Sequence, residues 1–350
     1  MKKIEMVDLK GQYRHIKEQV NKSVLETIES AMFINGPKVK SFQDHLEKYL
    51  DVKHVIPCAN GTDALQIALM GVGLKPGDEV ITADFTFAAT VEVISLLGLT
   101  PVLVDVDPKT FNIDLPSIEK VIGPKTKAII PVHLFGQAAD MEEILALANK
   151  HNLYVVEDNA QSIGANYTFS DGSKKKTGTL GHIGTTSFFP SKNLGAYGDG
   201  GAIFTNDDEL AHTIRGMVNH GMYIRYQHDV VGVNSRLDSI QAAILDIKLN
   251  YLDFYNESRK ASALKYNQRL ADHPNLITPF RKGDCDTHVY HQYTLKVIDG
   301  DRDGLINHLN EKGIPCGVYY PIPLHLQKAY TNGYDDADDF KLTLEIVNQG

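Results

Sequence analysis

The chain has 350 residues, of which 43% are hydrophobic and 23% are charged, and its formal net charge is −9. This length and composition predict a globular protein with a large core, divided into one large domain and a smaller one. The negative charge argues against nucleic acid or an anionic membrane as the main partner.

Other features of the composition bear on the compartment. The N-terminus has no apolar signal core, and no apolar run is long enough to span a membrane, so we expect a cytoplasmic protein. The three cysteines, Cys58, Cys285 and Cys316, are far apart and lack the spacing of metal ligands. They therefore predict a reducing compartment, with neither a disulfide framework nor a metal site.

The first elements are helical. Apolar residues at helical spacing predict one helix over residues 13–30 and a second over residues 42–50. A short strand over residues 54–57 precedes an Asn60-Gly61 turn and a helix that begins near Thr62 or Asp63. The free N–H groups of such a helix start favour a phosphate, although the same pattern is typical of a plain N-cap.

Strands and helices then alternate. We predict strands over residues 79–82, 101–105, 127–132, 153–157, 187–189 and 202–205, and helices over residues 86–97, 116–121 and 141–151. The first four strands are continuously apolar and β-branched, as expected for strands buried on both faces of a mostly parallel α/β sheet. The run Lys174-Lys175-Lys176 is interpreted as a solvated loop.

The pattern changes after Arg236. Residues 237–270 read as helical, and Leu245, Leu249 and Leu252 could cover a subunit or domain face. A strand over 291–297, a helix over 303–312 and a strand over 314–320 then predict a small α+β unit. We therefore place a large domain at residues 1–250 and a small C-terminal domain at residues 251–350.

Lys192 is the main candidate for chemistry. It lies between the aromatic run Ser187-Phe188-Phe189 and a glycine-rich turn. Aromatic side chains exclude water, desolvation lowers the pKa of an ammonium, and a lysine of lowered pKa can form a Schiff base. The alternative is a buried strand followed by a surface turn with a solvated lysine.

Asp158 is the second candidate, because it follows the predicted strand 153–157. Ligands of open α/β sheets bind at the carboxyl ends of the strands, where Asp158 could cap a strand or pair with a cationic ring nitrogen. Lysine and aspartate on one sheet fit pyridoxal phosphate (PLP) chemistry. Phe87 could stack on a flat cofactor or pack in the core, Ser187 could hold a phosphate or cap a strand, and His133 is read as structural.

Seven motifs occur in order along the chain: Asn60-Gly61-Thr62-Asp63-Ala64-Leu65, Thr86-Phe87-Ala88-Ala89-Thr90, Pro131-Val132-His133-Leu134-Phe135-Gly136-Gln137, Glu157-Asp158-Asn159-Ala160-Gln161, Ser187-Phe188-Phe189-Pro190-Ser191-Lys192 with Gly198-Asp199-Gly200-Gly201, Gly232-Val233-Asn234-Ser235-Arg236, and Tyr320-Pro321-Ile322-Pro323-Leu324-His325. Each motif alone is weak evidence for a family. With all seven in this order, the chain resembles the DegT/DnrJ/StrS family of sugar-nucleotide aminotransferases. The resemblance implies the PLP-dependent transferase fold type I.

The resemblance also implies residue roles. Lys192 would bind PLP covalently and move the proton, and Asp158 would pair with the pyridine nitrogen. The other implied contacts are Gln161 to the phenolic oxygen, Phe87 to the ring, Gly61, Thr62 and Ser187 to the phosphate, Asn234 to the phosphate site of the neighbouring subunit, Arg236 to the sugar nucleotide, and Tyr319, Tyr320 and His325 to the sugar pocket. The implied partners are L-glutamate and 2-oxoglutarate, a nucleotide-linked keto sugar and a second subunit, with pyridoxamine phosphate (PMP) as the intermediate cofactor form.

The resemblance identifies the substrate less closely than it identifies the site residues. The matching group aminates C3 of a UDP-linked 2-acetamido-3-keto-glucuronate, but such enzymes tend to have a histidine where this chain has Tyr319. A dTDP-linked 3-keto-6-deoxy sugar and amination at C4 therefore stay open, as do an amino-acid lyase and a non-catalytic regulatory protein on the same fold. The resemblance also implies a family-typical C-terminal tail beyond the given residues.

Overall fold

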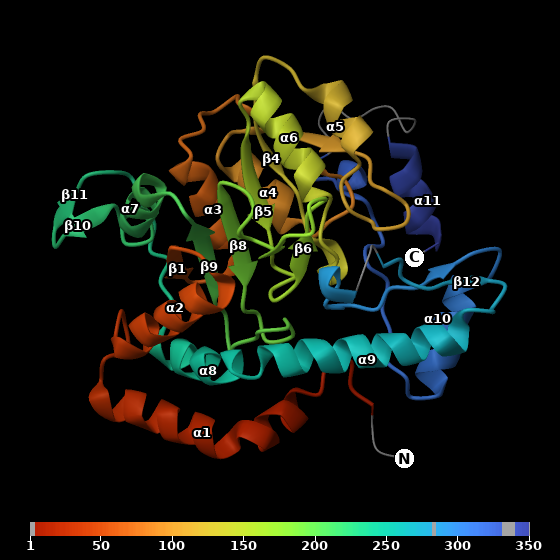
Figure 1. Cartoon of the computed structure of the whole chain (residues 1–350), viewed down its shortest axis with the longest axis horizontal. Helices are drawn as coiled ribbons and strands as arrows, with labels where there is room; N and C mark the ends of the chain where they lie inside the picture. Colours follow the sequence, from red (N-terminus) through yellow and green to blue (C-terminus); the bar gives the residue numbers. More distant parts are fainter. Residues whose placement is uncertain (1–3, 282–284, 331–339, 350) are drawn as a thin grey trace.

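A seven-stranded sheet forms the centre of the molecule, and the computed structural model describes residues 4–281, 285–330 and 340–349 (Figure 1). The strand order is β1-β9-β8-β5-β4-β2-β3. The strands are β1 (His54–Cys58), β2 (Glu79–Ala83), β3 (Thr100–Val104), β4 (Thr126–Ile130), β5 (Tyr154–Asp158), β8 (Ile183–Ser187) and β9 (Gly201–Thr205). Only β9 runs antiparallel to its neighbours in this sheet, which confirms the predicted mostly parallel α/β architecture.

Helices cover both faces of the sheet. One face packs against α3 (Gly61–Gly71), α4 (Ala89–Leu96) and α7 (Asp208–Met217), and the other against α5 (Leu115–Val121) and α6 (Met141–His151). The strands between these layers are almost wholly buried, as in β9, where every residue is buried. This explains why β2, β4 and β5 read as continuous apolar runs.

A third core lies at the β1–β9 end of the sheet. There α2 (Pro37–Leu50) and α8 (Ser239–Leu249) pack around Phe42, Phe188 and Phe204, all fully buried. Leu245, Leu249 and Leu252 belong to this core, so they pack within the chain and do not form an exposed subunit face. The helix α1 (Leu9–Ser30) packs along α8 (Figure 1).

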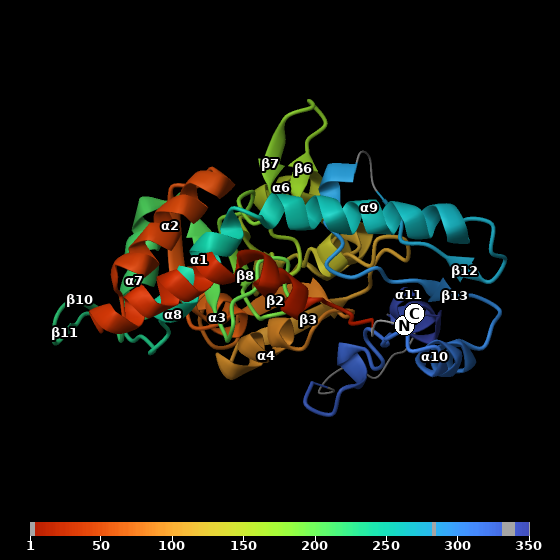
Figure 2. The same cartoon turned by 90° about the horizontal axis from the view of Figure 1, so that it is seen from below.

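The C-terminal region begins with the long helix α9 (Leu252–Leu270), which Asn250 and Tyr251 separate from α8. It contains β12 (Leu276–Ile277), β13 (Lys296–Val297), α10 (Arg302–Glu311) and α11 (Lys341–Gln349), grouped at one end of the molecule (Figure 2). Short 3-10 turns occur at η1 (Leu134–Gly136), η2 (Cys285–Thr287) and η3 (Leu324–Leu326).

The sequence prediction was wrong in several places. The predicted strand 187–189 is instead β8, which ends at Ser187. The predicted strand 291–297 reduces to the two-residue β13, and residues 314–320 contain no strand. The lysine run is no loop, since β7 (Lys174–Lys176) pairs with β6 (Asn166–Thr168). A small hairpin of β10 (Met222–Ile224) and β11 (Gln227–His228) was not predicted. The side chain of Cys285 lies outside the described residues.

Two negative findings concern the described residues. No helix among them combines the length and apolar composition needed to cross a membrane. No three histidine, cysteine or acidic side chains group there in a way that could hold a metal ion.

Candidate active site

Asp158 is the last residue of β5, at the carboxyl edge of the parallel strands. It is 6% exposed, and its carboxylate accepts hydrogen bonds from the Thr90 hydroxyl at 3.0 Å and from the Ala160 amide at 3.1 Å. Thr90 lies in the first turn of α4 and is fully buried. These two bonds fix the carboxylate where a ligand of an open α/β sheet is expected.

Lys192 follows β8 on a tight loop. Its backbone amide donates to the carbonyl of Phe189 at 2.8 Å. At the end of the loop, the Ala196 amide donates to the carbonyl of Phe188 at 2.7 Å. Desolvation lowers the pKa of its ammonium to about 8, against the opposing attraction of Asp158. Within the described part of the chain, its Nζ has neither a hydrogen bond nor an ion pair. The structure thus brings together the lysine and the aspartate that the sequence singled out.

Gly61 and Ser187 form a close cradle at the start of α3. A Cβ added to Gly61 would lie 2.6 Å from the Cβ of Ser187, so no larger residue fits there. The N-cap is Asn60, whose side chain accepts from the Asp63 amide at 2.8 Å, which corrects the expected cap at Thr62 or Asp63. Free N–H groups at the start of an eleven-residue helix, beside a serine hydroxyl, fit a phosphate group.

Gln161 joins this edge to the C-terminal region. Its Oε1 accepts from the Phe135 amide at 2.7 Å, and its Nε2 donates to the Tyr320 hydroxyl at 3.1 Å. Burial is the main reason that the pKa of Tyr320 is raised. Tyr320 therefore reaches the neighbourhood of Asp158 from a segment far along the chain.

The structure distinguishes the two phenylalanines after β2. Phe85 is 1% exposed and packs against Phe111, Phe135 and Tyr320, whereas Phe87 is 58% exposed. The ring of Phe87 lies 6.4 Å from that of Tyr320. Phe87 is consequently the ring of this pair that is free to contact a ligand, and Phe85 is a core residue.

Asn234 and Arg236 lie beside the β1–α3 turn. Asn234 forms an isolated β-bridge with Asn219, and the Arg236 guanidinium donates to the Asn219 side chain at 3.4 Å. The intervening Ser235 accepts from the Ala59 amide at 3.1 Å. This segment therefore lies next to the Gly61 cradle.

His325 has a different placement from the expected pocket wall. It is 3% exposed, its Nδ1 lies 2.6 Å from the buried carboxylate of Asp84, and its ring stacks on Phe340 at 4.3 Å. Asp84 also accepts from the His325 amide at 2.7 Å. His325 thus anchors its segment to the end of β2. Tyr319 is half-buried and packs on the same core as Tyr320.

His291 is a neighbour of Lys192 that the sequence did not reveal. Its pKa is held well below the usual value by burial and then by the charges of Lys192 and Arg259. Arg259 donates to the carbonyls of Tyr290 and His291 at 3.1 and 3.0 Å, which fixes this segment. The position of His291 depends on contacts between distant segments, so no local sequence signal identifies this residue.

His133 has structural contacts, as the sequence suggested. Its Nε2 lies 2.8 Å from Glu157, and its Nδ1 accepts from the Ala139 amide at 3.1 Å, all in the buried interior.

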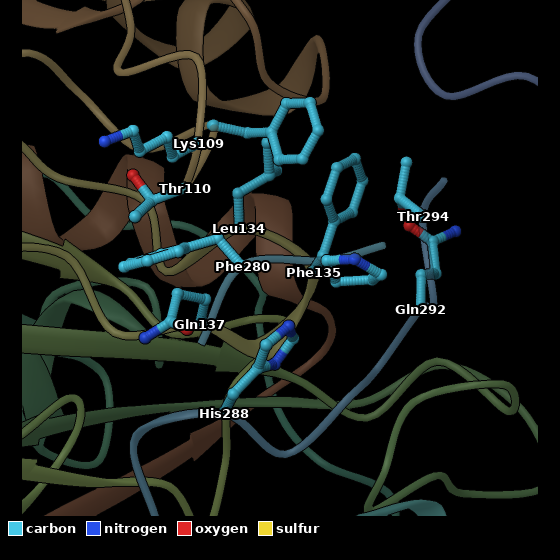
Figure 3. A pocket seen from close by; sticks show the side chains of 11 residues that line it. Lys109, Thr110, Leu134, Phe135, Gln137, Phe280, His288, Gln292 and Thr294 are labelled. Atoms are coloured by element: carbon cyan, nitrogen blue, oxygen red, sulfur yellow. The ribbon is translucent and has the colours of Figure 1, made fainter. Parts of the chain in front are cut away.

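A separate small pocket is lined by Phe135, Gln137 and His288, among others (Figure 3). Neither Lys192 nor Asp158 lines it, so we do not assign it to the candidate site.

Comparison with known proteins gives the family. Residues 14–350 match the DegT/DnrJ/EryC1/StrS aminotransferase family. The chain is a member of this family. It is therefore a PLP-dependent aminotransferase of the sugar-nucleotide class, and the cradle at Gly61 and the desolvated Lys192 fit that cofactor.

Individual relatives match nearly the whole chain. The chain is 48% identical to a "pleiotropic regulatory protein" of Geobacillus stearothermophilus, over 95% of this chain and 88% of the relative. It is 47% identical to UDP-2-acetamido-2-deoxy-3-oxo-D-glucuronate aminotransferase of Pseudomonas aeruginosa, over 93% and 88%. It is 38% identical to dTDP-3-amino-3,4,6-trideoxy-α-D-glucose transaminase of Streptomyces venezuelae, over 94% and 84%.

A solved structure agrees with the fold. NtdA from Bacillus subtilis with bound cofactor PMP superimposes with a TM-score of 0.90 at 32% identity, covering 100% of this chain and 80% of that one. That solved chain thus shares both the sheet and the C-terminal region described above.

Proposed function

We propose that this aminotransferase moves an amino group from L-glutamate to the C3 keto group of a UDP-linked 2-acetamido-3-keto sugar. The product would serve amino-sugar or surface polysaccharide synthesis, including lipopolysaccharide O-antigen, in the cytoplasm. The free thiols of Cys58 and Cys316 are compatible with that reducing compartment.

The observation that carries the proposal is the juxtaposition of Lys192 and Asp158 at one edge of the sheet. With a pKa of about 8, Lys192 provides more of its neutral amine near physiological pH than an ordinary lysine does. The Asp158 carboxylate, which accepts two hydrogen bonds, lies close enough to that amine to act on it electrostatically. A nucleophilic amine and a fixed anion are the two groups that PLP chemistry needs.

Each site residue then has a proposed task. PLP, when bound, supplies the electron sink for proton loss from the amino donor. Lys192 would hold the cofactor and, as a free amine, would take the proton from the α-carbon of the donor. Asp158 would keep the ring nitrogen protonated, Gln161 would bind the phenolic oxygen and Phe87 would cover the ring. Gly61, Thr62 and Ser187 would bind the phosphate.

The sugar nucleotide is proposed to lie between Arg236 and the tyrosine pair Tyr319-Tyr320. Arginine binds phosphate through paired donors, and an aromatic surface suits a sugar ring. The support for a UDP-linked 3-keto sugar is the 47% identity to the Pseudomonas enzyme, whose name gives that substrate. We assign His325 to holding this segment in place through Asp84.

One observation favours a second candidate. Tyr319 packs on the core, and it stands where enzymes for glucuronates tend to have a histidine. A phenol compensates a sugar carboxylate less than a cation does. This favours a sugar without a carboxylate, such as a dTDP-linked 3-keto-6-deoxy sugar.

We also propose a homodimer in which Asn234 completes the phosphate site of the partner. The support is a set of exposed apolar residues near it: Ile224, Tyr226 and Val231 are 60%, 76% and 84% exposed. Exposed apolar surface of this kind marks an interaction site. A purely regulatory role is less well supported, because such a role needs no desolvated amine beside a fixed carboxylate.

The test is a single-turnover assay with the protein in its PMP form. Separate samples receive UDP-linked 2-acetamido-3-keto-glucuronate, UDP-linked 2-acetamido-3-keto-glucose, and dTDP-linked 3-keto- and 4-keto-6-deoxy sugars, and mass spectrometry identifies any amino sugar. We expect the UDP-linked 3-keto sugars to react. Preference for a dTDP sugar would move the assignment to the second candidate, and no reaction with any sugar would contradict the proposal.

A further inference from the structure

A second lysine, more deeply buried than Lys192, lies beneath the loop that carries Lys192. This lysine, Lys248, is on α8 and is 1% exposed. Its ammonium donates a hydrogen bond to the carbonyl of Gly195 and lies 5.4 Å from the centroid of the Tyr197 ring. We call residues 189–200 the lysine loop. Lys248 therefore contacts two of its residues from the core side.

The burial of Lys248 is not offset by a carboxylate. None of the described acidic side chains forms a salt bridge with it, and desolvation alone accounts for a pKa lowered to about 8. An unpaired buried ammonium costs folding free energy. A hydrophobic side chain of the same length would fill the space without that cost, so the amine has some other use.

A second residue of α8 holds the same loop. Gln241 lies two turns before Lys248, and its Oε1 accepts from the Tyr197 amide at 2.9 Å. A Cβ added to Gly198 would lie 2.9 Å from the Nε2 of Gln241, so the glutamine leaves no room for a larger residue there. The helix thus contacts the loop at Gly195, Tyr197 and Gly198, all C-terminal to Lys192.

The loop itself is a tight turn at Gly195. A Cβ at Gly195 would lie 2.3 Å from the carbonyl oxygen of Pro190, so the two ends of the turn touch. Lys248 binds the carbonyl of this same residue, Gly195. A shift of Gly195 would therefore move Pro190 and, with it, the backbone that precedes Lys192.

We propose that Lys248 is a positioning residue for Lys192: its buried ammonium holds the Gly195 carbonyl and thereby fixes the direction of the Lys192 side chain. The inference rests on the proposed role of Lys192 as the cofactor-binding lysine. It adds a residue that touches neither cofactor nor substrate but decides how fast Lys192 can react.

The test compares Lys248→Met, which keeps an unbranched side chain one atom shorter but removes the ammonium, with wild type and with Lys248→Arg, which keeps the charge. Lys176→Met is a matched control, because Lys176 also donates to a glycine carbonyl, that of Gly164 at 3.2 Å, and lies 5.0 Å from the ring of Tyr49. Cofactor-free proteins are mixed with PLP at pH 7.5, samples are reduced with borohydride at intervals, and peptide mapping gives the rate of attachment at Lys192. Thermal unfolding is recorded for each cofactor-free protein.

For K248M we expect attachment to slow by at least about tenfold, because a misplacement of a reacting group by about 1 Å can cost about 100-fold in rate. We expect its unfolding midpoint to equal or exceed that of wild type, K248R to recover part of the rate, and K176M to stay within about twofold of wild type.

A K248M protein that attaches PLP as fast as wild type would overturn the proposal. So would one that fails to fold or that unfolds well below K176M, since Lys248 would then be structural. If wild type itself never attaches PLP at Lys192, the proposed function fails, which is a separate result from equal rates in wild type and K248M.

Discussion

At the residue scale, the environment of Lys192 decides its reactivity. Burial removes water from the ammonium, while Asp158 partly stabilises its charge, and the balance is a pKa of about 8. Because the folded pKa is below the unfolded value of about 10.4, the charged amine costs stability below pH 8. That cost is relieved as the pH rises from 8 to about 10.4, so stability gains from this group toward alkaline pH.

The same pKa predicts how PLP attachment depends on pH. Only the neutral amine is a nucleophile, so the attachment rate should rise about tenfold per pH unit below 8 and level off above it. Stopped-flow absorbance of the cofactor-free protein mixed with PLP gives this profile. A rate that still rises steeply between pH 9 and about 10.4, as for a solvated lysine, would contradict the account.

Thr90 provides a second test at this scale. Its hydroxyl is the side-chain donor to Asp158 at 3.0 Å, and a hydrogen bond to a charged group contributes about 1.5–3 kcal/mol. Thr90→Val should therefore lower kcat for the glutamate half-reaction by about 10- to 100-fold with a small change in KM. Thr90→Ser, which keeps the hydroxyl, should stay near wild type, and equal losses in both variants would argue for packing alone.

At the element scale, two strand ends hold the C-terminal region. Asp84 after β2 binds the His325 backbone and ring, and Asp105 after β3 accepts from the amides of Leu342 and Thr343 at 2.9 and 2.7 Å, in the first turn of α11. Burial raises the pKa of Asp84, although His325 opposes this effect. Asp84 thereby holds the segment that carries Tyr320 at this edge of the sheet, and Asp105 holds α11.

Breaking the Asp84–His325 pair should loosen that segment. Loss of one member of a buried pair costs about 3–5 kcal/mol, so Asp84→Ala should lower the free energy of unfolding by about that amount. His325→Ala should have a similar effect, and the double variant should cost little more than either single one. Urea unfolding of all four proteins measures this, and fully additive losses would show that the two residues act independently.

The sequence predicted the parallel strands well because β2, β4 and β5 are buried on both faces and therefore continuously apolar. It misplaced β8, because this buried strand contains Thr185 and Thr186, whose hydroxyls donate to the carbonyls of Glu157 and Asn159. Asp158 ends β5 and Lys192 follows β8, which are positions that a local sequence pattern can point to. His291, Thr90 and Lys248 act through contacts between distant segments, which no local pattern encodes.

At the scale of the whole molecule, the exposed β10–β11 hairpin favours active sites that two subunits share. The β10–β11 hairpin projects beside α7 (Figure 1), and its exposed Ile224 and Tyr226 are near the segment of Asn234. We propose that a second copy covers this hairpin. The domain division near residue 250 stays a prediction; α8 ends at Leu249 and α9 begins at Leu252, after Asn250 and Tyr251.

Mixing two inactive variants tests the shared site. If Asn234 serves the partner's site, a hybrid dimer of Lys192→Ala and Asn234→Ala has one intact site, and random pairing should restore about a quarter of wild-type activity. If Asn234 serves its own subunit, both sites of the hybrid are damaged and no activity returns. Size-exclusion chromatography of the mixture confirms whether the subunits have exchanged.

The most direct test of the central claim is the absorbance spectrum of wild type and Lys192→Ala with PLP, before and after L-glutamate. The account predicts that wild type shows the band of lysine-bound PLP and that glutamate converts it to the PMP spectrum, whereas Lys192→Ala shows no lysine-bound band. A lysine-bound band in Lys192→Ala, or a wild-type band that glutamate leaves unchanged, would contradict it.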